Sequence, residues 1–179
     1  MTLIEAEIRR AHAEGSLIGI CEWADGGAEL WGQITRLSDF ALELDELNSL
    51  GQPDGKSTIE FEDIYALSDN YDYAVRLLLL KDFSPTQPFT DSMARKPKGI
   101  REVLEKGLAS QEFLTLEVKG EGRRASKVLD LSETEAKIQT FGDLGIPTQE
   151  MTLRLTMITG ARIGTASEEA EAYLAGLRD

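Results

Sequence analysis

The chain is poor in the residues that metal sites, disulfides and cysteine–histidine catalysis require. Its 179 residues include one cysteine and one histidine. Zinc sites built from several such residues, disulfide frameworks and catalytic pairs drawn from them are therefore excluded. Long apolar stretches are missing as well, since the run Leu77–Leu80 is far too short to cross a bilayer. We expect no cofactor, no metal ion and no membrane partner.

The first fifteen residues also lack a continuous hydrophobic stretch. The segment MTLIEAEIRRAHAEG carries acids among its apolar residues, unlike a secretory signal. We therefore expect a soluble, cytoplasmic protein. Its lone Cys21, inside LIGICEW, is then expected to be a small buried hydrophobe.

Basic residues are scarce relative to acidic ones, 19 against 32, and the net charge is −13. Binding to phosphate backbones and to anionic membranes relies on Lys and Arg, so this balance opposes both. The apolar content of 41% provides a core and opposes global disorder. The imbalance is local: residues 1–94 hold 18 acids and 6 bases, whereas residues 95–179 hold 14 and 13.

The second half begins with a relatively basic zone. This zone is either a solvated face that limits repulsion between the halves or a docking surface, for an anion or for the acidic half of another copy. Its members are Arg95, Lys96, Lys98, Arg101, Lys106, Lys119, Arg123, Arg124 and Lys127.

An internal repeat organises the chain. Shifting the sequence by 94 residues superimposes apolar positions and a Gly-x-Pro loop without a gap. We interpret this match as a duplication that gives two similar units. The coinciding pairs are Ile34 with Val128, Leu37 with Leu131, Ser38 with Ser132, Leu44 with Ile138, Leu47 with Phe141, Leu50 with Leu144, Gly51 with Gly145, Pro53 with Pro147, Ile59 with Leu153, Phe61 with Leu155 and Ile64 with Ile158.

Each unit is expected to contain a helix, four to five short strands and a closing helix. Capping boxes at Thr2 with Glu5 and at Thr165 with Glu168 mark two helix starts. A period of two along residues 40–45 indicates a half-buried strand. Asp69 is the expected N-cap of the helix that closes the first unit.

Short, strongly bent strands with flanking helices, in about 80 residues, are typical of a small barrel. The prolines of residues 83–97 indicate a linker. The predicted fold is therefore mainly β with flanking helices (α+β), with one barrel in residues 1–82 and another in residues 98–179. Packing the two as a pseudo-dimer would bury apolar area and cover sheet edges.

The segment GQITRLSDFALELDEL, residues 32–47, resembles the first Sm motif: a glycine in a bent strand, a tight acidic turn and an alternating strand. The resemblance covers most of residues 1–68 and, more faintly, 98–163. It implies a divergent tandem Sm-like (LSm-type) protein made of two Sm-like or SH3-like barrels with a habit of assembly.

The departures from this family concern its RNA-binding residues. RNA-binding members carry an Asn in the turn, which SDFAL at 38–42 and SETEA at 132–136 both lack. The cationic pair of the second motif is absent from YAL at 65–67 and only partly matched by TGAR at 159–162. Uridine binding is therefore not implied by the resemblance.

Three other features have structural interpretations. GEGRRA at 120–125 matches a dinucleotide-binding pattern, but a strand-like segment follows it, which favours a hairpin turn. Trp23 and Trp31 lie among apolar strand residues and are expected to pack in a core or interface. His12 has no evident catalytic partner and is expected at the surface.

Together these features predict a non-enzymatic binding or scaffold protein. It would recognise a protein partner, or itself, through acidic barrel surfaces, as an inhibitor or immunity-type protein does. The alternative is an RNA- or nucleotide-binding Sm-like protein with a non-standard site, which the charge disfavours; a carboxylate-based hydrolase is a third hypothesis. The candidate contact residues are Ser38, Asp39, Phe40, Ser132, Glu133 and Arg162.

Overall fold

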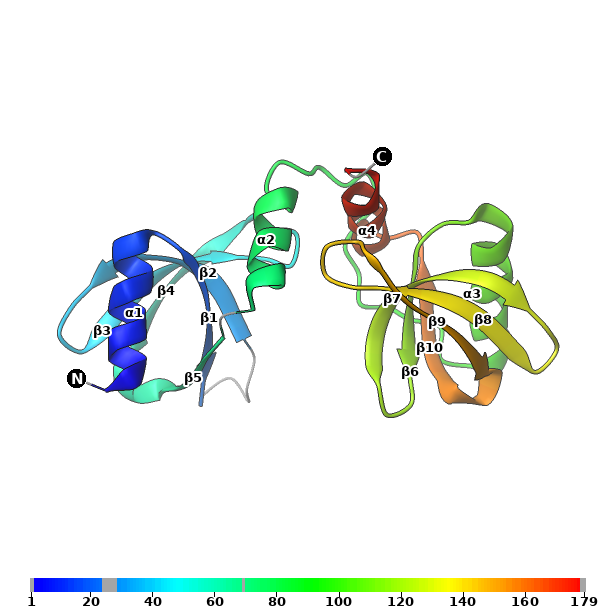
Figure 1. The fold of residues 1–179 in the computed structure, drawn as a ribbon, viewed down its shortest axis with the longest axis horizontal. Coiled ribbons are helices and arrows are strands. Elements are labelled where there is room, and N and C mark those ends of the chain that lie inside the picture. Colours follow the sequence, from blue (N-terminus) through cyan, green and yellow to red (C-terminus); the bar gives the residue numbers. More distant parts are fainter. Residues whose placement is uncertain (1, 24–28, 69, 178–179) are drawn as a thin grey trace. The chain divides into compact units, whose positions relative to one another are not determined.

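The protein contains two compact units with the same order of elements (Figure 1). The computed structural model describes residues 2–23, 29–68 and 70–177. Unit 1 is Met1–Asp82 and unit 2 is Phe83–Asp179. In the described residues each unit has one five-stranded antiparallel sheet and two helices, so the fold is mainly β and of the α+β class.

Unit 1 forms a sheet with the strand order β4-β3-β2-β1-β5, in which every pair is antiparallel. Consecutive strands are therefore neighbours, except that β5 returns to pair with β1. The elements of this unit are α1 (Leu3–Glu14), β1 (Leu17–Glu22), β2 (Glu29–Leu37), β3 (Ala41–Leu47), β4 (Pro53–Glu60), the 3₁₀ turn η1 (Phe61–Asp63), β5 (Ile64–Ser68) and α2 (Tyr71–Leu80).

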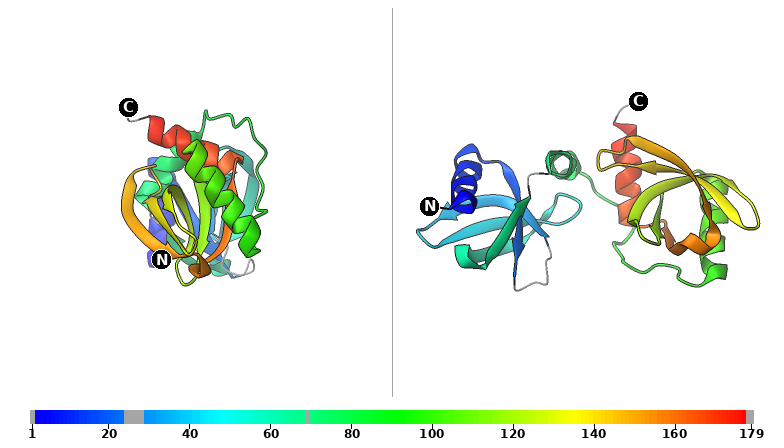
Figure 2. Two further views of the ribbon diagram at one scale, coloured as in Figure 1. Left: turned by 90° about the vertical axis from the view of Figure 1, so that its right-hand side faces the viewer. Right: turned by 60° about the horizontal axis from the view of Figure 1, so that its bottom comes forward.

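Unit 2 repeats this topology with the strand order β9-β8-β7-β6-β10. Helix α3 contacts β7 and β10, as α1 contacts β2 in unit 1 (Figure 2). The elements are α3 (Pro97–Ser110), β6 (Leu114–Val118), β7 (Gly122–Leu131), β8 (Glu135–Phe141), β9 (Pro147–Arg154), the 3₁₀ turn η2 (Leu155–Met157), β10 (Ile158–Ile163) and α4 (Ala166–Gly176).

The predicted repeat is present in the strand pairing itself. Ile34 pairs with Leu44, and Val128 pairs with Ile138 after a shift of 94 residues. The bulge that follows each of these pairs recurs at the same position. The first helix and first strand of the units correspond at a shift of 96 residues, because Ile18 and its partner Gly32 are 14 positions apart whereas Leu114 and its partner Ser126 are 12 apart.

The strand pairing leaves both sheets open, whereas closed barrels were predicted. Strands β4 and β5 are the two edges of the first sheet. Only the three residues of η1 join the end of β4 at Glu60 to the start of β5 at Ile64. The sheet therefore has to curl until its opposite edges approach each other at this corner, and η2 does the same in unit 2.

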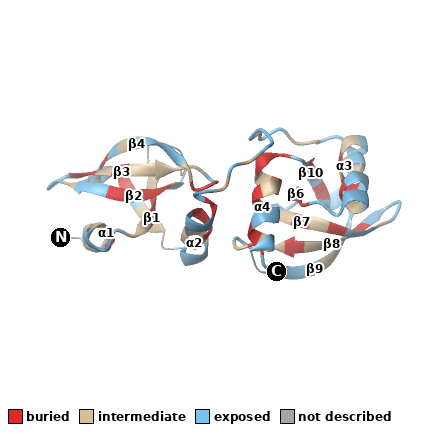
Figure 3. Ribbon diagram, turned by 90° about the horizontal axis from the view of Figure 1, so that it is seen from above, coloured by how far each residue is buried: buried red, intermediate tan, exposed pale blue. Residues whose placement is uncertain are grey.

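Each unit has its own apolar core between the sheet and its first helix. Ile8 of α1 packs with Ile34 and Leu44 in unit 1, and Leu104 of α3 packs with Val128 in unit 2. Buried residues accordingly lie on the strands and on the sheet-facing sides of the helices (Figure 3). In the described part of the chain, no helix is both long and apolar enough to cross a membrane.

The segment predicted to be a linker belongs to unit 2. Residues 86–95, here called the strap, run along its surface. Ala94 forms an antiparallel bridge with Ala161 of β10, and Pro88 O accepts a hydrogen bond from Ala166 N–H at 3.3 Å. Pro97, the last residue of the expected linker, is the first residue of α3. Backbone pairing by the strap thus replaces the free connection that the prolines suggested.

Several local expectations are settled as well. Residues 120–122 form a hairpin turn between β6 and β7, as predicted. Trp31 is buried as expected, but Trp23 is 69% exposed, and Cys21 is only partly buried. Asp69 lies outside the described residues, and the N-cap of α2 is Asn70, which accepts a hydrogen bond from Tyr73 N–H.

Candidate functional site

The turns between the second and third strands have the same construction in both units. Ser38 Oγ accepts hydrogen bonds from the N–H groups of Phe40 at 3.3 Å and Ala41 at 2.9 Å. Ser132 Oγ does the same for Thr134 and Glu135. These serines therefore shape the turns through local side-chain-to-backbone bonds. In unit 1 the turn places the Phe40 ring in solvent, 70% exposed.

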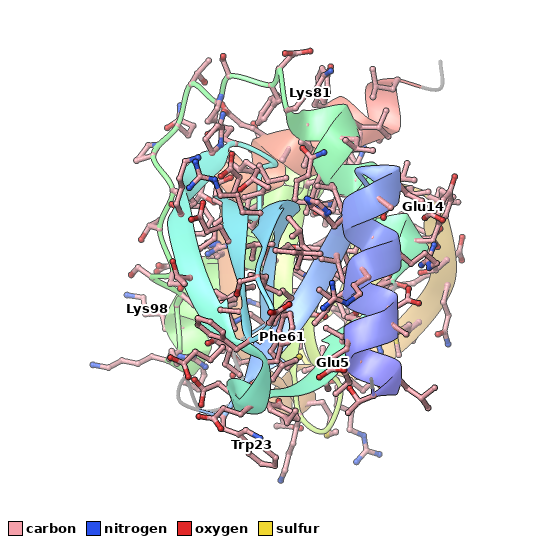
Figure 4. All side chains as sticks on the ribbon, turned by 90° about the vertical axis from the view of Figure 1, so that its left-hand side faces the viewer. Glu5, Glu14, Trp23, Phe61, Lys81 and Lys98 are labelled. Atoms are coloured by element: carbon pink, nitrogen blue, oxygen red, sulfur yellow. The ribbon has the colours of Figure 1, made fainter. Side chains whose placement is uncertain are left out.

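Phe40 borders a hollow of about 640 Å³ in unit 1. The hollow lies where the start of α1, the β2–β3 turn and η1 meet. Figure 4 shows Glu5 and Phe61 close together near this end of α1. Its lining consists of Thr2, Ile4, Glu5, Asp39, Phe40, Glu60, Phe61, Glu62 and Ile64. We call this feature the acidic hollow.

The acidic hollow combines an apolar lining with a rim of carboxylates. Its apolar members, apart from exposed Phe40, are buried or half-buried. Four carboxylates, those of Glu5, Asp39, Glu60 and Glu62, surround them. Glu5 is held in place by the capping box, in which its carboxylate accepts from Thr2 N–H at 2.8 Å. Such a surface suits an occupant that is both apolar and cationic.

The same positions in unit 2 keep the buried and half-buried apolar residues, but arginines replace two of the four carboxylates. Arg101 corresponds to Glu5, and Arg154 corresponds to Glu60. Thr134 replaces Phe40, while Glu133 retains the acid of Asp39. The guanidinium of Arg101 donates to the backbone oxygens of Ser132 at 3.3 Å and Glu133 at 3.2 Å. The candidate contact residues Ser132 and Glu133 are thus hydrogen-bonded to α3.

Arg162, predicted as a partner contact, is buried inside unit 2. Its side chain is 8% exposed and its Nε lies 3.1 Å from Glu168 Oε1, whose side chain is 4% exposed. It also donates to Thr90 O of the strap, and Thr115 Oγ1 donates to Glu168. The guanidinium therefore joins β10, α4 and the strap instead of facing a partner.

Two carboxylates beside the strap have lowered pKa values. The hydrogen bond from Arg95 lowers the pKa of Glu117 below its ordinary value of 4.5, and Thr159 and Arg123 add to the effect. The hydroxyl of Thr86 lowers the pKa of Glu169, assisted by backbone N–H groups. Both carboxylates are held ionised by groups that fix the strap to the sheet and to α4.

An exposed aromatic pair in unit 1 was not predicted as a surface feature. The rings of Trp23 and Tyr65 are 4.7 Å apart at their centroids, beside the edge strand β5. Partial burial raises the pKa of Tyr65, and neighbouring Cys21 adds to the shift. Alternation in the sequence could have located Tyr65 on the strand, but it gives no sign that Trp23 leaves the core.

Unit 2 has a hollow of about 580 Å³ between α3, the start of β6 and α4. Lys127 Nζ lies 4.6 Å above the Phe113 ring there, and Lys106, Glu168 and Glu169 also line it. The charges in this hollow are mixed. Among the described residues, no cluster of three or more His, Cys, Asp or Glu side chains could hold a metal ion.

We compared the chain with protein-family models, with curated proteins and with solved structures, and none of the three comparisons gives a match.

Proposed function

We propose that the chain is a non-enzymatic binding protein that recognises a basic segment of a protein partner through the acidic hollow of unit 1. One observation carries the proposal: exposed Phe40 stands among four carboxylates over an apolar lining. An aromatic anchor ringed by polar groups is typical of binding hot spots. An inhibitor or immunity-type protein that masks a basic partner fits this description.

The charge of the hollow favours a cationic partner and selects against an acidic one. Carboxylates steer the encounter with Lys and Arg side chains and raise the association rate at low salt. The corresponding face of unit 2 carries Lys98, Arg101 and Arg154, which would repel the same partner. Specificity for a basic segment is therefore a property of unit 1.

We also propose that each unit is a Sm-like small barrel of the LSm type. The order of helix, four strands, 3₁₀ turn and closing strand supports this assignment, as does the bulge of β2 between Ile34 and Arg36. The packing of the two as a pseudo-dimer, and further self-assembly, stay predictions. Light scattering of the purified chain measures the assembly state.

The proposal is tested with an array of peptides that vary in Lys, Arg, Asp, Glu and apolar content. We expect the bound peptides to combine Lys or Arg with an apolar residue, and binding to fall with added salt. Phe40→Ala should weaken binding about 10- to 30-fold, the effect of removing a hot spot.

The matched control is Thr134→Ala, which changes the equivalent position in unit 2 and should leave binding unchanged. Selection of acidic peptides, or equal binding by the Phe40→Ala variant, would overturn the proposal.

The alternative, binding of RNA or nucleotides, is favoured by the reversed charge of unit 2. Lys98 is exposed in the first turn of α3, and Arg154 is exposed opposite Glu135, which follows the turn at Ser132. Phosphate contacts rely on such side chains. Filter binding with short RNAs and thermal shift with nucleotides test this hypothesis, and the absence of any retained ligand ends it.

A further inference from the structure

The edge strands β5 and β10 occupy the same place in the two sheets. Leu67 of β5 lies opposite Ile20, and Ala161 of β10 lies opposite Leu116. In unit 2 the outer side of this edge is covered, because Ala94 N–H donates to Ala161 O at 2.8 Å and Ala161 N–H donates to Ala94 O at 3.0 Å. The strap thus adds a short strand to the sheet.

The corresponding edge of unit 1 has no such cover in the part of the chain that the structure describes. The N–H and C=O groups of Leu67 hold the place of those of Ala161, which face away from the sheet, and among the described residues they form no backbone hydrogen bond outside the sheet. A strand edge with free backbone groups is a template for another extended segment. Unit 2 shows how such a segment sits on this edge.

Two features beside Leu67 can receive the side chains of such a segment. A hollow of about 220 Å³ opens next to Leu67 and Ser68, between these residues, β1 and α1. Further along the strand, the rings of Trp23 and Tyr65 form an exposed apolar surface. At the equivalent places unit 2 has Lys119 and Thr159, and Thr159 bonds to Glu117.

The charges define the chemistry of the occupant. In unit 2 the strap residue Asp91 pairs with Arg123 at 2.8 Å. The residue of unit 1 at the position of Arg123 is Glu29, so a segment docked there needs a cation where the strap has Asp91. Unit 1 as a whole holds 17 acidic and 6 basic residues. A basic segment is therefore complementary both locally and over the whole unit.

We propose that the outer edge of β5 binds an extended, basic peptide segment of a partner protein by strand addition, in the way that unit 2 binds its own strap. Backbone hydrogen bonds at Leu67 supply the register, and the hollow and the aromatic pair select side chains. The inference rests on the proposed function in that the partner is a basic protein segment, but it uses a surface other than the acidic hollow.

The test uses the full chain and peptides that copy the strap sequence. The probe is labelled PFTDSMARK, the sequence of residues 88–96, with the change Asp91→Lys. We expect this peptide to bind in fluorescence anisotropy, and the unchanged peptide to bind more weakly because its Asp faces Glu29. An N-methyl group on the peptide residue equivalent to Ala94 removes one backbone hydrogen bond and should weaken binding about tenfold or more. Hydrogen exchange should slow at the amide of Leu67.

Matched variants separate this edge from the acidic hollow. Leu67→Pro removes the N–H and should abolish binding of the probe, whereas Leu67→Val keeps the N–H and should retain it. Phe40→Ala should leave probe binding intact, so failure of the acidic hollow and failure of the edge are distinguishable. If Leu67→Pro does not fold, the N-methylated peptide still decides the question.

Three results would overturn the inference. The first is equal binding of the N-methylated peptide, and the second is slowed exchange at Ala161 instead of Leu67. The third is protection of Leu67 that rises with protein concentration in the absence of peptide, which would identify a second copy of this chain as the occupant.

Discussion

Glu60 of unit 1 and Arg154 of unit 2 hold the same position at the end of an edge strand, yet they carry opposite charges. Their sheets have the same strand order, the same bulges and the same 3₁₀ turn. The buried positions of the duplicated sequence therefore keep the fold, while the exposed positions are free to acquire different binding properties. The binding function that we propose therefore depends on the differences between the units.

A second difference concerns a buried ion pair of unit 2. Unit 2 places Arg162 and Glu168 in its interior. In unit 1, Ser68 stands at the position of Arg162, and Tyr73 stands where Glu168 does, three residues after the N-cap of the closing helix. The ion pair of unit 2 holds the strap through Thr90. Among its described residues, unit 1 has no ion pair at these two positions and no bridge on the outer edge of β5.

The largest expected effect comes from breaking this ion pair. Glu168→Ala leaves a buried guanidinium without its partner and removes the capping box of α4, so the free energy of unfolding should fall by about 3–5 kcal/mol. Urea unfolding followed by far-UV circular dichroism measures the loss. Tryptophan fluorescence reports on unit 1 in the same experiment, because both tryptophans, Trp23 and Trp31, lie there.

The double variant Arg162→Ser with Glu168→Ala removes both charges of the pair and serves as the control. It should lose less stability than Glu168→Ala alone, since no unpaired charge stays buried. If the double variant is as unstable as Glu168→Ala alone, the unpaired charge of Arg162 is not the cause of the lost stability.

A smaller effect is expected at Gly32, where the units differ in backbone packing. A Cβ at Gly32 would lie 2.2 Å from the backbone oxygen of Asp45, so Gly32→Ala forces the two strands apart. We expect unit 1 to lose about 1–3 kcal/mol, seen as an earlier fluorescence transition in urea. The equivalent residue of unit 2, Ser126, is buried and already carries a Cβ. Ser126→Ala should therefore leave the free energy of unfolding almost unchanged. Equal losses would contradict the close approach at Gly32.

The smallest expected effect is a pH dependence of the strap. Because the folded-state pKa of Glu117 is lowered by Arg95, its pairing stabilises the strap above the ordinary pKa of 4.5 and is lost as the pH falls through the lowered value. The exchange protection factor of the Ala94 amide should therefore be constant above pH 4.5 and fall as the pH is lowered below that value. Glu117→Gln should flatten this dependence, and protection that rises on acidification would contradict it.

Much of the fold could be predicted from local pattern. The alternation around Leu44 located β3, and both capping boxes form where their spacing placed them. The shift of 94 residues identified corresponding strands because buried apolar positions recur in a duplicated sheet. These features depend on neighbouring residues or on spacing that the sequence displays directly.

The remainder depends on contacts between distant residues. Ala94 pairs with β10 through its backbone alone. Backbone pairing of this kind requires no particular side chain, so the sequence does not reveal it. The nearby prolines therefore suggested a linker. Arg162 resembles any strand-end cation until Glu168 is brought beside it by α4. Phe40 and Asp39 were identified from the turn, but the other carboxylates of the acidic hollow come from α1 and from the end of β4 with η1. Their convergence is a result of the curl of the sheet.

The bridge between Ala94 and Ala161 also bears on how unit 2 folds. The two residues are far apart in sequence, so their pairing requires closure of a long loop. The strap is synthesised before β10, and it is ready to pair as soon as that strand forms. Until then the edge of β10 is open to strands of other chains. The strap therefore shortens the interval in which newly made molecules can aggregate through this edge.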